Sequence, residues 1–339
     1  MTNKTCRLSI IIPTYNVESY IEETLNSCLQ QDIPQEEYEI ICIDDGSNDG
    51  TVSKIEKIAS ANKNIRLFTQ KNSGVSATRN RGIELANGNY IWFVDSDDLI
   101  APNCIGFLLT EAEKHDTEKL LFGMEHFTNR PKIKNQSIDF DFCNENSKIY
   151  DFIFSNNFGG VCRSFYKTEH IKKNNINFKT NLAFSEDVLF DFTFLIHCKK
   201  CLKTESFFYF YRQRTGSTMH SSNHDKHIAS MQSLAKEYLL LANKDIPSYW
   251  QQLSKRKSCF AIKALLFSLV QKGDVQLAKG YIEKLKAEKL YPYPFFNILF
   301  TNKTFKESII NWISFLFPLK WYFMLCVRIS SLKKKFFKK

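Results

Sequence analysis

Short apolar runs alternate with amphipathic stretches over the first hundred residues of the chain. Four runs rich in β-branched and aromatic residues predict buried strands, at residues 8–12, 39–43, 65–68 and 90–94. The stretches between them carry apolar side chains at helical spacing and predict helices, at residues 18–31, across Val52–Ala59 and at residues 75–86. Strands and helices that alternate in this order predict a parallel sheet with helices on both faces.

The pattern changes in the second part of the chain. The alternation fades after about residue 125, and the 30 phenylalanines of the chain predict large buried or interfacial apolar surfaces. From about residue 225 onward the pattern is mainly helical. We therefore expect an α/β domain in residues 1–220, with a mixed, mainly parallel sheet flanked by helices, and a helical C-terminal region in residues 221–339.

Net charge and cysteine content indicate the kind of partner and the cellular compartment. Of the formal net charge of +10, residues 320–339 supply +7 and contain no acidic side chain, which favours an anionic partner such as a membrane surface or nucleic acid. The ten cysteines are scattered, several of them in apolar runs, as in a reducing compartment. Cys198 and Cys201 form a single CxxC with no second pair, and we expect no metal there. The apolar run at residues 8–12 is too short for a signal peptide, so we expect a cytoplasmic protein.

Three polar clusters follow predicted strands of the sheet. They are Pro13–Asn16, Asp44–Ser47 and Asp95–Asp98. Ligands of such sheets bind beyond the carboxyl ends of the strands, so these clusters indicate a binding site. Asp, Ser and Asn are also ordinary helix N-caps, but capping explains one acidic residue in each loop, not two and then three.

The third cluster has the spacing of a metal site. Asp95 and Asp97 alternate along an extended segment, so both side chains can reach one cation. Carboxylate oxygens suit Mg²⁺ or Mn²⁺, which also accept phosphate oxygens as ligands. The repulsion among Asp95, Asp97 and Asp98 therefore predicts a bound cation or a cationic ligand.

Four segments in order, "LSIIIPTYN", "EIICIDDGSNDGT", "QKNSGVSATRNRGI" and "GNYIWFVDSDDLI", resemble the family 2 glycosyltransferases of the GT-A fold. The resemblance is dense over residues 7–105 and sparser to about residue 220. It implies a nucleotide-binding half in residues 1–105 and an acceptor-side half in residues 106–220. It also implies a nucleotide-sugar donor, with the acidic second cluster favouring a UDP-sugar, and a glycan or lipid-linked acceptor in cell-surface polysaccharide synthesis.

The resemblance also assigns roles to individual residues. It implies contacts to the base and ribose from Pro13, Tyr15 and Asn16, to uracil from Asp45 and Asp44, and to the nucleotide from Asn72 and Arg79. It implies that Asp97 binds the metal and that Asp95 binds the metal or the ribose.

An acidic pair precedes a later predicted helix. Glu186 and Asp187 could be there only because acids favour helix N-termini. Similar transferases carry an acidic pair at this place and use its aspartate as the general base. The resemblance therefore implies that Asp187 is the base and that Glu186 orients it or holds an acceptor hydroxyl.

A basic segment, "YRQRTGSTMH", follows the aromatic run. Arg212, Arg214 and Ser217 could clamp a diphosphate, because guanidinium pairs bidentately with phosphate, and the resemblance implies a lid here. Arginines exposed beside a turn are the alternative. His220 is a candidate for the metal or the phosphate, although histidines in such a polar stretch are often simply solvated.

These features predict an inverting glycosyltransferase that uses Mg²⁺ or Mn²⁺. The rival is a non-catalytic membrane- or nucleic-acid-binding protein with a degenerate sugar-nucleotide domain. Clustered acidic side chains do not suit an anion-binding groove, so we expect no nucleic acid. A nucleotidyltransferase is disfavoured because no glycine-rich phosphate loop follows the first strand.

The C-terminal tail, residues 305–339, predicts a surface anchor. Its apolar stretches are broken by Pro318, Lys320 and Arg328, and each is shorter than the roughly twenty residues that span a bilayer. Aromatic and lysine residues suit the interface and anionic headgroups. We expect the tail to hold the protein on the inner face of the cell membrane; a helix packed on the protein's own core is the alternative.

Overall fold

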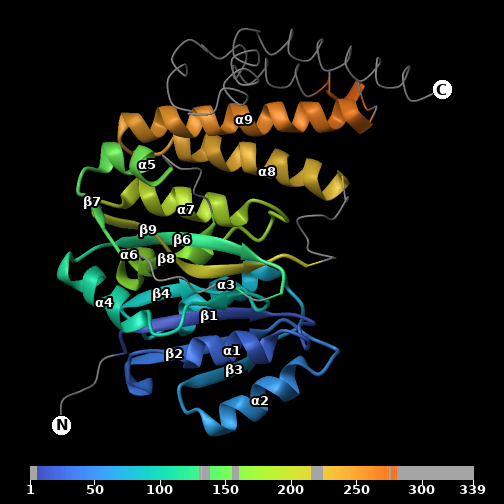
Figure 1. Cartoon of the computed structure of the whole chain (residues 1–339). Coiled ribbons are helices and arrows are strands. Elements are labelled where there is room, and N and C mark those ends of the chain that lie inside the picture. Colours follow the sequence, from blue (N-terminus) through green and yellow to red (C-terminus); the bar gives the residue numbers. More distant parts are fainter. Residues whose placement is uncertain are drawn as a thin grey trace. The chain divides into compact units, whose positions relative to one another are not determined.

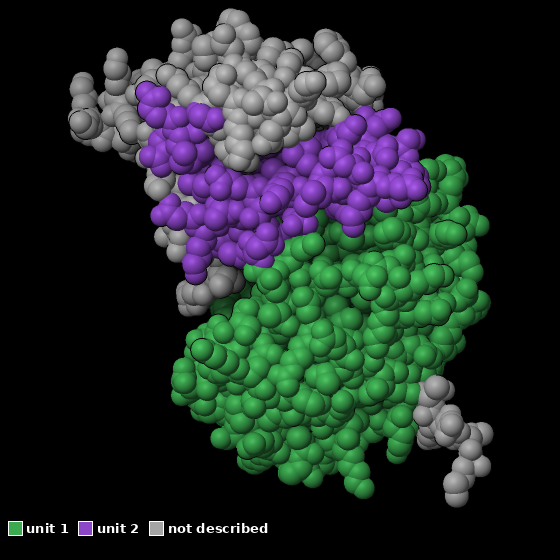
Figure 2. Space-filling model, turned by 180° about the vertical axis from the view of Figure 1, so that it is seen from behind, with its two compact units in different colours: residues 1–180, 185–221 green, residues 181–184, 222–339 purple. Residues whose placement is uncertain are grey.

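A computed structural model describes residues 6–280 with a few gaps, at residues 130, 132–137, 155–159, 215–223, 273, 275 and 279. The chain divides into two compact units (Figure 2). The first comprises Met1–Thr180 and Ser185–Ser221, and the second Asn181–Phe184 and Ser222–Lys339. The predicted anchor at residues 305–339 and the candidates Ser217 and His220 lie outside the described residues.

Strands of the first unit form one sheet, in which the described residues contribute nine strands (Figure 1). They are β1 (Leu8–Thr14), β2 (Tyr38–Asp44), β3 (Ile65–Thr69), β4 (Tyr90–Phe93), β5 (Leu99–Ile100), β6 (Lys119–Phe127), β7 (Asp141–Cys143), β8 (Ser164–Lys167) and β9 (Cys201–Arg212). Their order is β3-β2-β1-β4-β8-β6-β9-β5, and β7 pairs with β9.

The sheet is parallel at one end and mixed at the other. Strand β1 pairs in parallel with β2 and β4, and β2 with β3. Strand β8 is antiparallel to β4 and β6, whereas β6 and β9 are parallel. The predicted mixed sheet flanked by helices is confirmed.

Helices connect the strands and form the second unit. In the first unit they are α1 (Ile21–Leu29), α2 (Thr51–Ala61), α3 (Val75–Leu85), α4 (Ile105–Lys114), α5 (Asn146–Phe154), α6 (Thr168–Lys173) and α7 (Glu186–His197), with 3₁₀ turns η1 (Gln35–Glu37) and η2 (Val161–Arg163). The second unit contains α8 (His224–Ala242) and α9 (Ser248–Lys272), which confirms a helical C-terminal region. No helix in the described part of the chain has the length and apolar character needed to cross a membrane.

The β-branched run of β1 is buried on both faces, as its sequence predicts. Ile10 and Ile12 belong to the same apolar cluster as Leu25 of α1. Ile11 points the other way, because side chains alternate along a strand, and it meets Gly82 of α3. A Cβ at Gly82 would lie 2.4 Å from Ile11 Cγ2, so only glycine permits this close packing of α3 on the sheet.

Aromatic side chains attach α7 to the same face of the sheet as α3. Phe93, the last residue of β4, meets the rings of Phe178 and Phe190 edge-on, with centroids 5.2 and 5.6 Å away. Phe178 and Phe190 stack with their centroids 4.1 Å apart. These contacts bring α7, which begins at Glu186, beside the carboxyl end of β4.

Candidate active site

The three polar clusters lie at one edge of the sheet because their strands are neighbours. In the β1–β2 register Thr14 is opposite Asp44, and β4 runs parallel on the other side of β1. Asn16 has a positive φ of 50° and joins the first two clusters. Its N–H donates to Ser47 Oγ at 2.9 Å, and its Oδ1 accepts the N–H of Asn48 at 2.9 Å.

The Asp44 carboxylate accepts hydrogen bonds from its own turn. It accepts the N–H groups of Gly46 and Ser47 at 3.1 and 2.9 Å and the Ser47 hydroxyl at 2.5 Å. The side chain is buried, and Thr14 Oγ1 lies 3.3 Å from its Oδ1. These contacts indicate that Asp44 shapes the turn; its contact to a base stays a prediction.

Asp45 holds the loop that precedes α3. Its Oδ1 accepts Gln70 Nε2 and the N–H of Ser73, and its Oδ2 accepts the N–H of Gly74, each at 2.8 Å. A carboxylate offers about four lone-pair directions, so about one remains for a donor such as the N–H of a base. Asn72 lies in this loop and is exposed.

The turn after the first strand presents Tyr15 and Asn16 to solvent. Tyr15 follows Pro13 and Thr14 at the carboxyl end of β1, and 48% of its surface is exposed. An aromatic ring exposed beside Asn16 is available to stack on a planar ligand. The assignment of Pro13, Tyr15 and Asn16 to base and ribose stays a prediction that this placement allows.

The three carboxylates after β4 have different surroundings. Asp98 is buried, and its oxygens accept the Tyr209 hydroxyl at 2.6 Å and the Arg212 N–H at 2.7 Å. The Tyr209 oxygen also accepts the N–H of Asp95 at 3.1 Å. Asp98 therefore ties the motif to β9, while the side chains of Asp95 and Asp97 remain 33% and 20% exposed.

The electrostatics of this motif fit a cation. Burial and the charges of Asp95 and Asp97 raise the pKa of Asp98 to about 8, and burial and Asp95 raise the pKa of Asp97. Like charges therefore gather in this loop, where Arg79 pairs with Asp95 and Arg214 pairs with Asp97. No group of three or more His, Cys, Asp or Glu side chains suited to a metal occurs within the described ranges. Metal binding by Asp95 and Asp97 stays a prediction, in which phosphate and water would supply the other ligands of the cation.

Arg79 joins the metal candidates to the acidic pair of α7. Its Nη2 donates to Asp95 Oδ1 at 2.9 Å, and its Nη1 donates to Glu186 Oε1 at 3.0 Å. The guanidinium is buried and lies over the Phe178 ring, 5.3 Å from its centroid. One guanidinium therefore places two motifs that are about ninety residues apart in the sequence next to each other.

Asp187 has the properties of a base near neutral pH. Burial and the charge of Glu186 raise its pKa to about 6, although Arg79 acts in the opposite direction. Its Oδ1 accepts the N–H of Val188 at 2.8 Å. The backbone of Gly160, with a φ of +105°, lies close enough that a Cβ there would be 3.9 Å from Asp187 Oδ2. A general base works best when its pKa lies near the operating pH.

Arg212, the last residue of β9, and Arg214 have different surroundings. Arg212 is buried, and it donates to the Asp97 carbonyl and to Glu23 Oε2, both at 2.6 Å. It is therefore part of the scaffold beneath the motif rather than an arginine exposed beside a turn. Arg214 Nε lies 2.6 Å from Asp97 Oδ2, so Arg214 lies at one metal candidate as Arg79 lies at the other. A diphosphate contact by either stays a prediction.

Sequence reasoning missed Tyr209 and Gly160. Tyr209 lies in the run "FFYFYR", and its buried hydroxyl supports two residues of the acidic motif. Nothing in that run distinguishes it from a core aromatic residue. Gly160 precedes η2 and has a positive φ, which glycine adopts without strain. The presence of a glycine at this position is the one local sign of that conformation.

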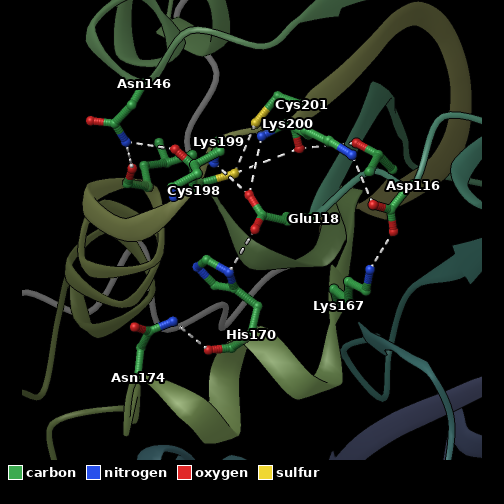
Figure 3. Close-up of polar contacts among 12 residues, drawn as sticks. Asp116, Glu118, Asn146, Lys167, His170, Asn174, Cys198, Lys199, Lys200 and Cys201 are labelled. Carbon is green, nitrogen blue, oxygen red and sulfur yellow. Dashed lines mark hydrogen bonds and ion pairs between the residues drawn. The ribbon is translucent and has the colours of Figure 1, made fainter.

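Glu118 organises a polar cluster around the turn that follows α7 (Figure 3). Its Oε2 accepts the N–H of Lys199 and, at 3.1 Å, the N–H of Lys200, and its Oε1 lies 3.2 Å from His170 Nδ1. Cys198 and Cys201 flank the turn and are buried, with their sulfurs 3.3 Å apart. The turn is thus built around the carboxylate.

Replacing Glu118 with glutamine is expected to remove a pH-dependent part of the stability. Burial alone would raise its pKa, but hydrogen bonds from His170 and the Lys199 and Lys200 N–H groups bring it from 4.5 to about 2. A depressed pKa stabilises the fold above about pH 4.5, and this stabilisation is lost as the pH falls towards 2. Denaturant unfolding should show the variant about 2–3 kcal/mol less stable at pH 7, with the difference shrinking below pH 4. A difference that is constant from pH 7 to pH 3 would contradict the expectation.

Comparisons with known proteins agree with this geometry. Residues 9–171 match the model of glycosyl transferase family 2. The poly(ribitol-phosphate) beta-glucosyltransferase of Bacillus spizizenii is 30% identical over 209 residues, which are 60% of this chain and 32% of that protein. The poly(ribitol-phosphate) beta-N-acetylglucosaminyltransferase TarS of Staphylococcus aureus is 29% identical over 220 residues, 64% of this chain and 37% of that protein. The chain thus matches about a third of the length of these relatives.

The likeness extends to solved structures. A crystal structure of Staphylococcus aureus TarS 1-349 in complex with UDP-GlcNAc superposes with a TM-score of 0.60 and 27% identity, covering 78% of this chain and 72% of that one. A mannosyltransferase from Pyrobaculum calidifontis, 14% identical with a TM-score of 0.53, shares the fold. Residues 9–171, just under half of the chain, therefore match glycosyl transferase family 2, and these relatives and the GT-A arrangement of the sheet agree with that match.

Proposed function

We propose that this protein transfers a sugar from a UDP-linked donor to a hydroxyl of a cell-surface glycan or lipid-linked acceptor, with inversion at the anomeric carbon. The observation that carries the proposal is the Arg79 bridge between Asp95 and Glu186. It sets a candidate diphosphate site beside a candidate base, as a single displacement requires. The names of the relatives, which specify glucosyl and N-acetylglucosaminyl transfer to poly(ribitol phosphate), support a polyol or glycan hydroxyl as acceptor.

In this proposal the donor lies along the carboxyl edge of β1, β2 and β4. Tyr15, Asn16 and Asp45 face the nucleoside, and Asn72 lies in the loop that Asp45 holds. Asp95 and Asp97 would hold Mg²⁺ or Mn²⁺, which supplies positive charge to the departing diphosphate. Arg214, already beside Asp97, would contact that diphosphate.

Asp187 would take the proton from the acceptor hydroxyl, whose oxygen attacks the anomeric carbon from the face opposite the diphosphate. The new bond to the acceptor forms as the bond to the diphosphate breaks, so no sugar–enzyme intermediate is needed. Glu186 is held by Arg79 and in turn keeps the pKa of Asp187 raised. The base is thereby poised near the pH at which it acts.

Thermal unfolding with a panel of UDP- and GDP-sugars, with Mn²⁺ and with EDTA, tests the donor. A ligand present at about a hundred times its Kd stabilises the fold by about 2.7 kcal/mol, which is a shift of several degrees. We expect UDP, UDP-N-acetylglucosamine or UDP-glucose to raise the Tm with Mn²⁺ and GDP-sugars to have no effect. Stabilisation by GDP-sugars alone, or by none of them, would contradict the proposal.

We further propose that residues 305–339 hold the enzyme on the inner face of the membrane, near its acceptor. The support is the sequence: lysines and interfacial aromatic residues with interrupted apolar stretches. Full-length protein should co-sediment with anionic liposomes at low salt, and protein lacking residues 305–339 should stay in the supernatant while it still binds UDP. Equal sedimentation of the two proteins, or of neither, would rule out the anchor.

A further inference from the structure

Helix α7 carries a buried carboxylate one turn after the candidate base. Asp191 is 2% exposed, and it meets Lys119 of β6 and Tyr166 of β8, both of which are 0% exposed. Lys119 Nζ donates to Asp191 Oδ1 and, at 3.0 Å, to the Tyr166 hydroxyl. The Tyr166 hydroxyl donates to Asp191 Oδ1 at 2.8 Å. The three side chains therefore form a closed polar triad between α7 and the sheet.

The surroundings of the triad are aromatic. The Tyr166 ring meets the rings of Phe190 and Phe194 of α7 edge-on, with centroids 5.6 and 5.0 Å away. Lys119 Nζ lies 4.4 Å from the centroid of the Tyr166 ring. Taking both charges out of water is costly, and an apolar replacement of such a pair is often no less stable. Stability alone therefore does not account for an ion pair at this place.

A role in fixing the orientation of α7 does account for the Lys119–Asp191 ion pair. Seven of the twelve residues of α7 are buried, most of them aromatic or aliphatic. Such contacts are not directional, so an α-helix could turn by the roughly 100° between successive residues and still bury apolar side chains. Asp187 and Asp191 are four residues apart and share one face of the helix. Hydrogen bonds that fix Asp191 consequently fix the direction of Asp187.

The residue that precedes Lys119 holds the turn that follows the same helix. Glu118 accepts the N–H groups of Lys199 and Lys200 in the turn after α7, as Figure 3 shows. Glu118, just before β6, and Lys119, its first residue, thus hold the turn after α7 and the middle of α7.

We propose that Lys119 and Tyr166 are positioning residues, which act through Asp191 to set the rotation of α7 and so to aim the carboxylate of Asp187 at the acceptor hydroxyl. This inference rests on the proposed function of Asp187. Neither Lys119 nor Tyr166 touches the substrate in this account. Their effect falls on the rate of the chemical step and not on the affinity for the nucleotide, which binds to residues on β1, β2 and β4.

The test is the double variant Lys119→Met/Asp191→Leu, which removes both charges and leaves no unpaired ion in the core. Release of UDP from UDP-N-acetylglucosamine and UDP-glucose gives kcat and KM, calorimetry gives the affinity for UDP, and thermal unfolding reports the fold. We expect a Tm equal to or above that of the wild type and an unchanged UDP affinity. We expect kcat to fall about 10- to 100-fold, as a base misplaced by about 1 Å would cause.

A milder variant and a catalytic variant accompany it. Tyr166→Phe keeps the ion pair and removes one hydrogen bond, so its kcat should lie between those of the wild type and the double variant. A stable double variant with wild-type kcat, or one in which UDP affinity and Tm fall together with kcat, overturns the positioning role. Asp187→Asn separates the two claims: if it is inactive while the double variant is fully active, only the positioning inference fails. If Asp187→Asn is itself fully active, the assignment of the base fails and this inference fails with it.

Discussion

Replacing Asp187 with asparagine is expected to lower sugar transfer by about two to four orders of magnitude, the usual contribution of a general base. Asparagine keeps the size of the side chain and can still accept the Val188 N–H, but it cannot take a proton. Steady-state release of UDP measures the rate, and calorimetry with UDP should show an affinity within about twofold of the wild type.

The control for this variant is Glu169→Gln. Glu169 lies in the first turn of α6, so the substitution removes a helix-terminal charge of the same kind away from the site. Its transfer rate should equal that of the wild type. Near-normal transfer by Asp187→Asn would mean that the acid serves only the helix terminus and that the base is another residue.

The pH dependence of sugar transfer by the wild type tests the same assignment of Asp187 as the general base. Since burial and Glu186 raise the pKa of Asp187 to about 6, transfer should be fast above that pH and fall as the pH drops through it. In Asp187→Asn the residual rate should lack this acidic limb. An identical limb in both proteins would assign the titration to a different group.

Replacing Asp97 with asparagine is expected to abolish the dependence of UDP binding on Mn²⁺ and to remove transfer. The substitution takes a formal charge from a site where hard cations need carboxylate oxygens. Calorimetry with UDP, with and without Mn²⁺, measures the effect. The same metal dependence in the variant and the wild type would contradict the assignment of Asp97.

Asp98→Asn is the matched control, because it changes the next carboxylate in the same loop. The oxygens of Asp98 already accept the Tyr209 hydroxyl and the Arg212 N–H, so they are directed towards β9. Asparagine keeps the size of the side chain and one accepting oxygen. Metal-dependent UDP binding should therefore survive in Asp98→Asn.

The edge of the sheet that carries the three polar clusters could be predicted from the sequence, because the pattern of residues within each strand determines it. The run at residues 8–12 is β-branched and continuous, so it had to be a strand buried on both faces. Once the strands are parallel neighbours, the clusters that follow them must share an edge of the sheet. Burial of Asp98, by contrast, depends on Tyr209, which follows it by more than a hundred residues.

The contacts of the arginines could not be predicted for the same reason. Arg79 meets Asp95 and Glu186 only because α3 and α7 pack on one face of the sheet, through Ile11 and Phe93. Arg212 looks like an exposed guanidinium in its local sequence. At the end of β9 it donates to the Asp97 carbonyl, so it supports the acidic motif.

Helix α7 contains a residue whose burial its own sequence does not indicate. Apolar residues recur along the helix, and Leu189, Phe192 and Leu195 are buried. Asp191 is buried among them because Lys119 supplies its charge partner from the sheet. A buried ion pair between distant segments leaves no periodic signal in either of them.

The stereochemistry of donor hydrolysis tests the central claim most directly, and it needs no knowledge of the acceptor. With water in place of the acceptor hydroxyl, a single displacement on the α-linked donor UDP-N-acetylglucosamine releases the sugar first as the β-anomer. Proton NMR of the anomeric signal, recorded before mutarotation, distinguishes the anomers. The account predicts that the β-anomer appears first in the wild type and that Asp187→Asn releases almost no sugar. Initial release of the α-anomer would contradict it.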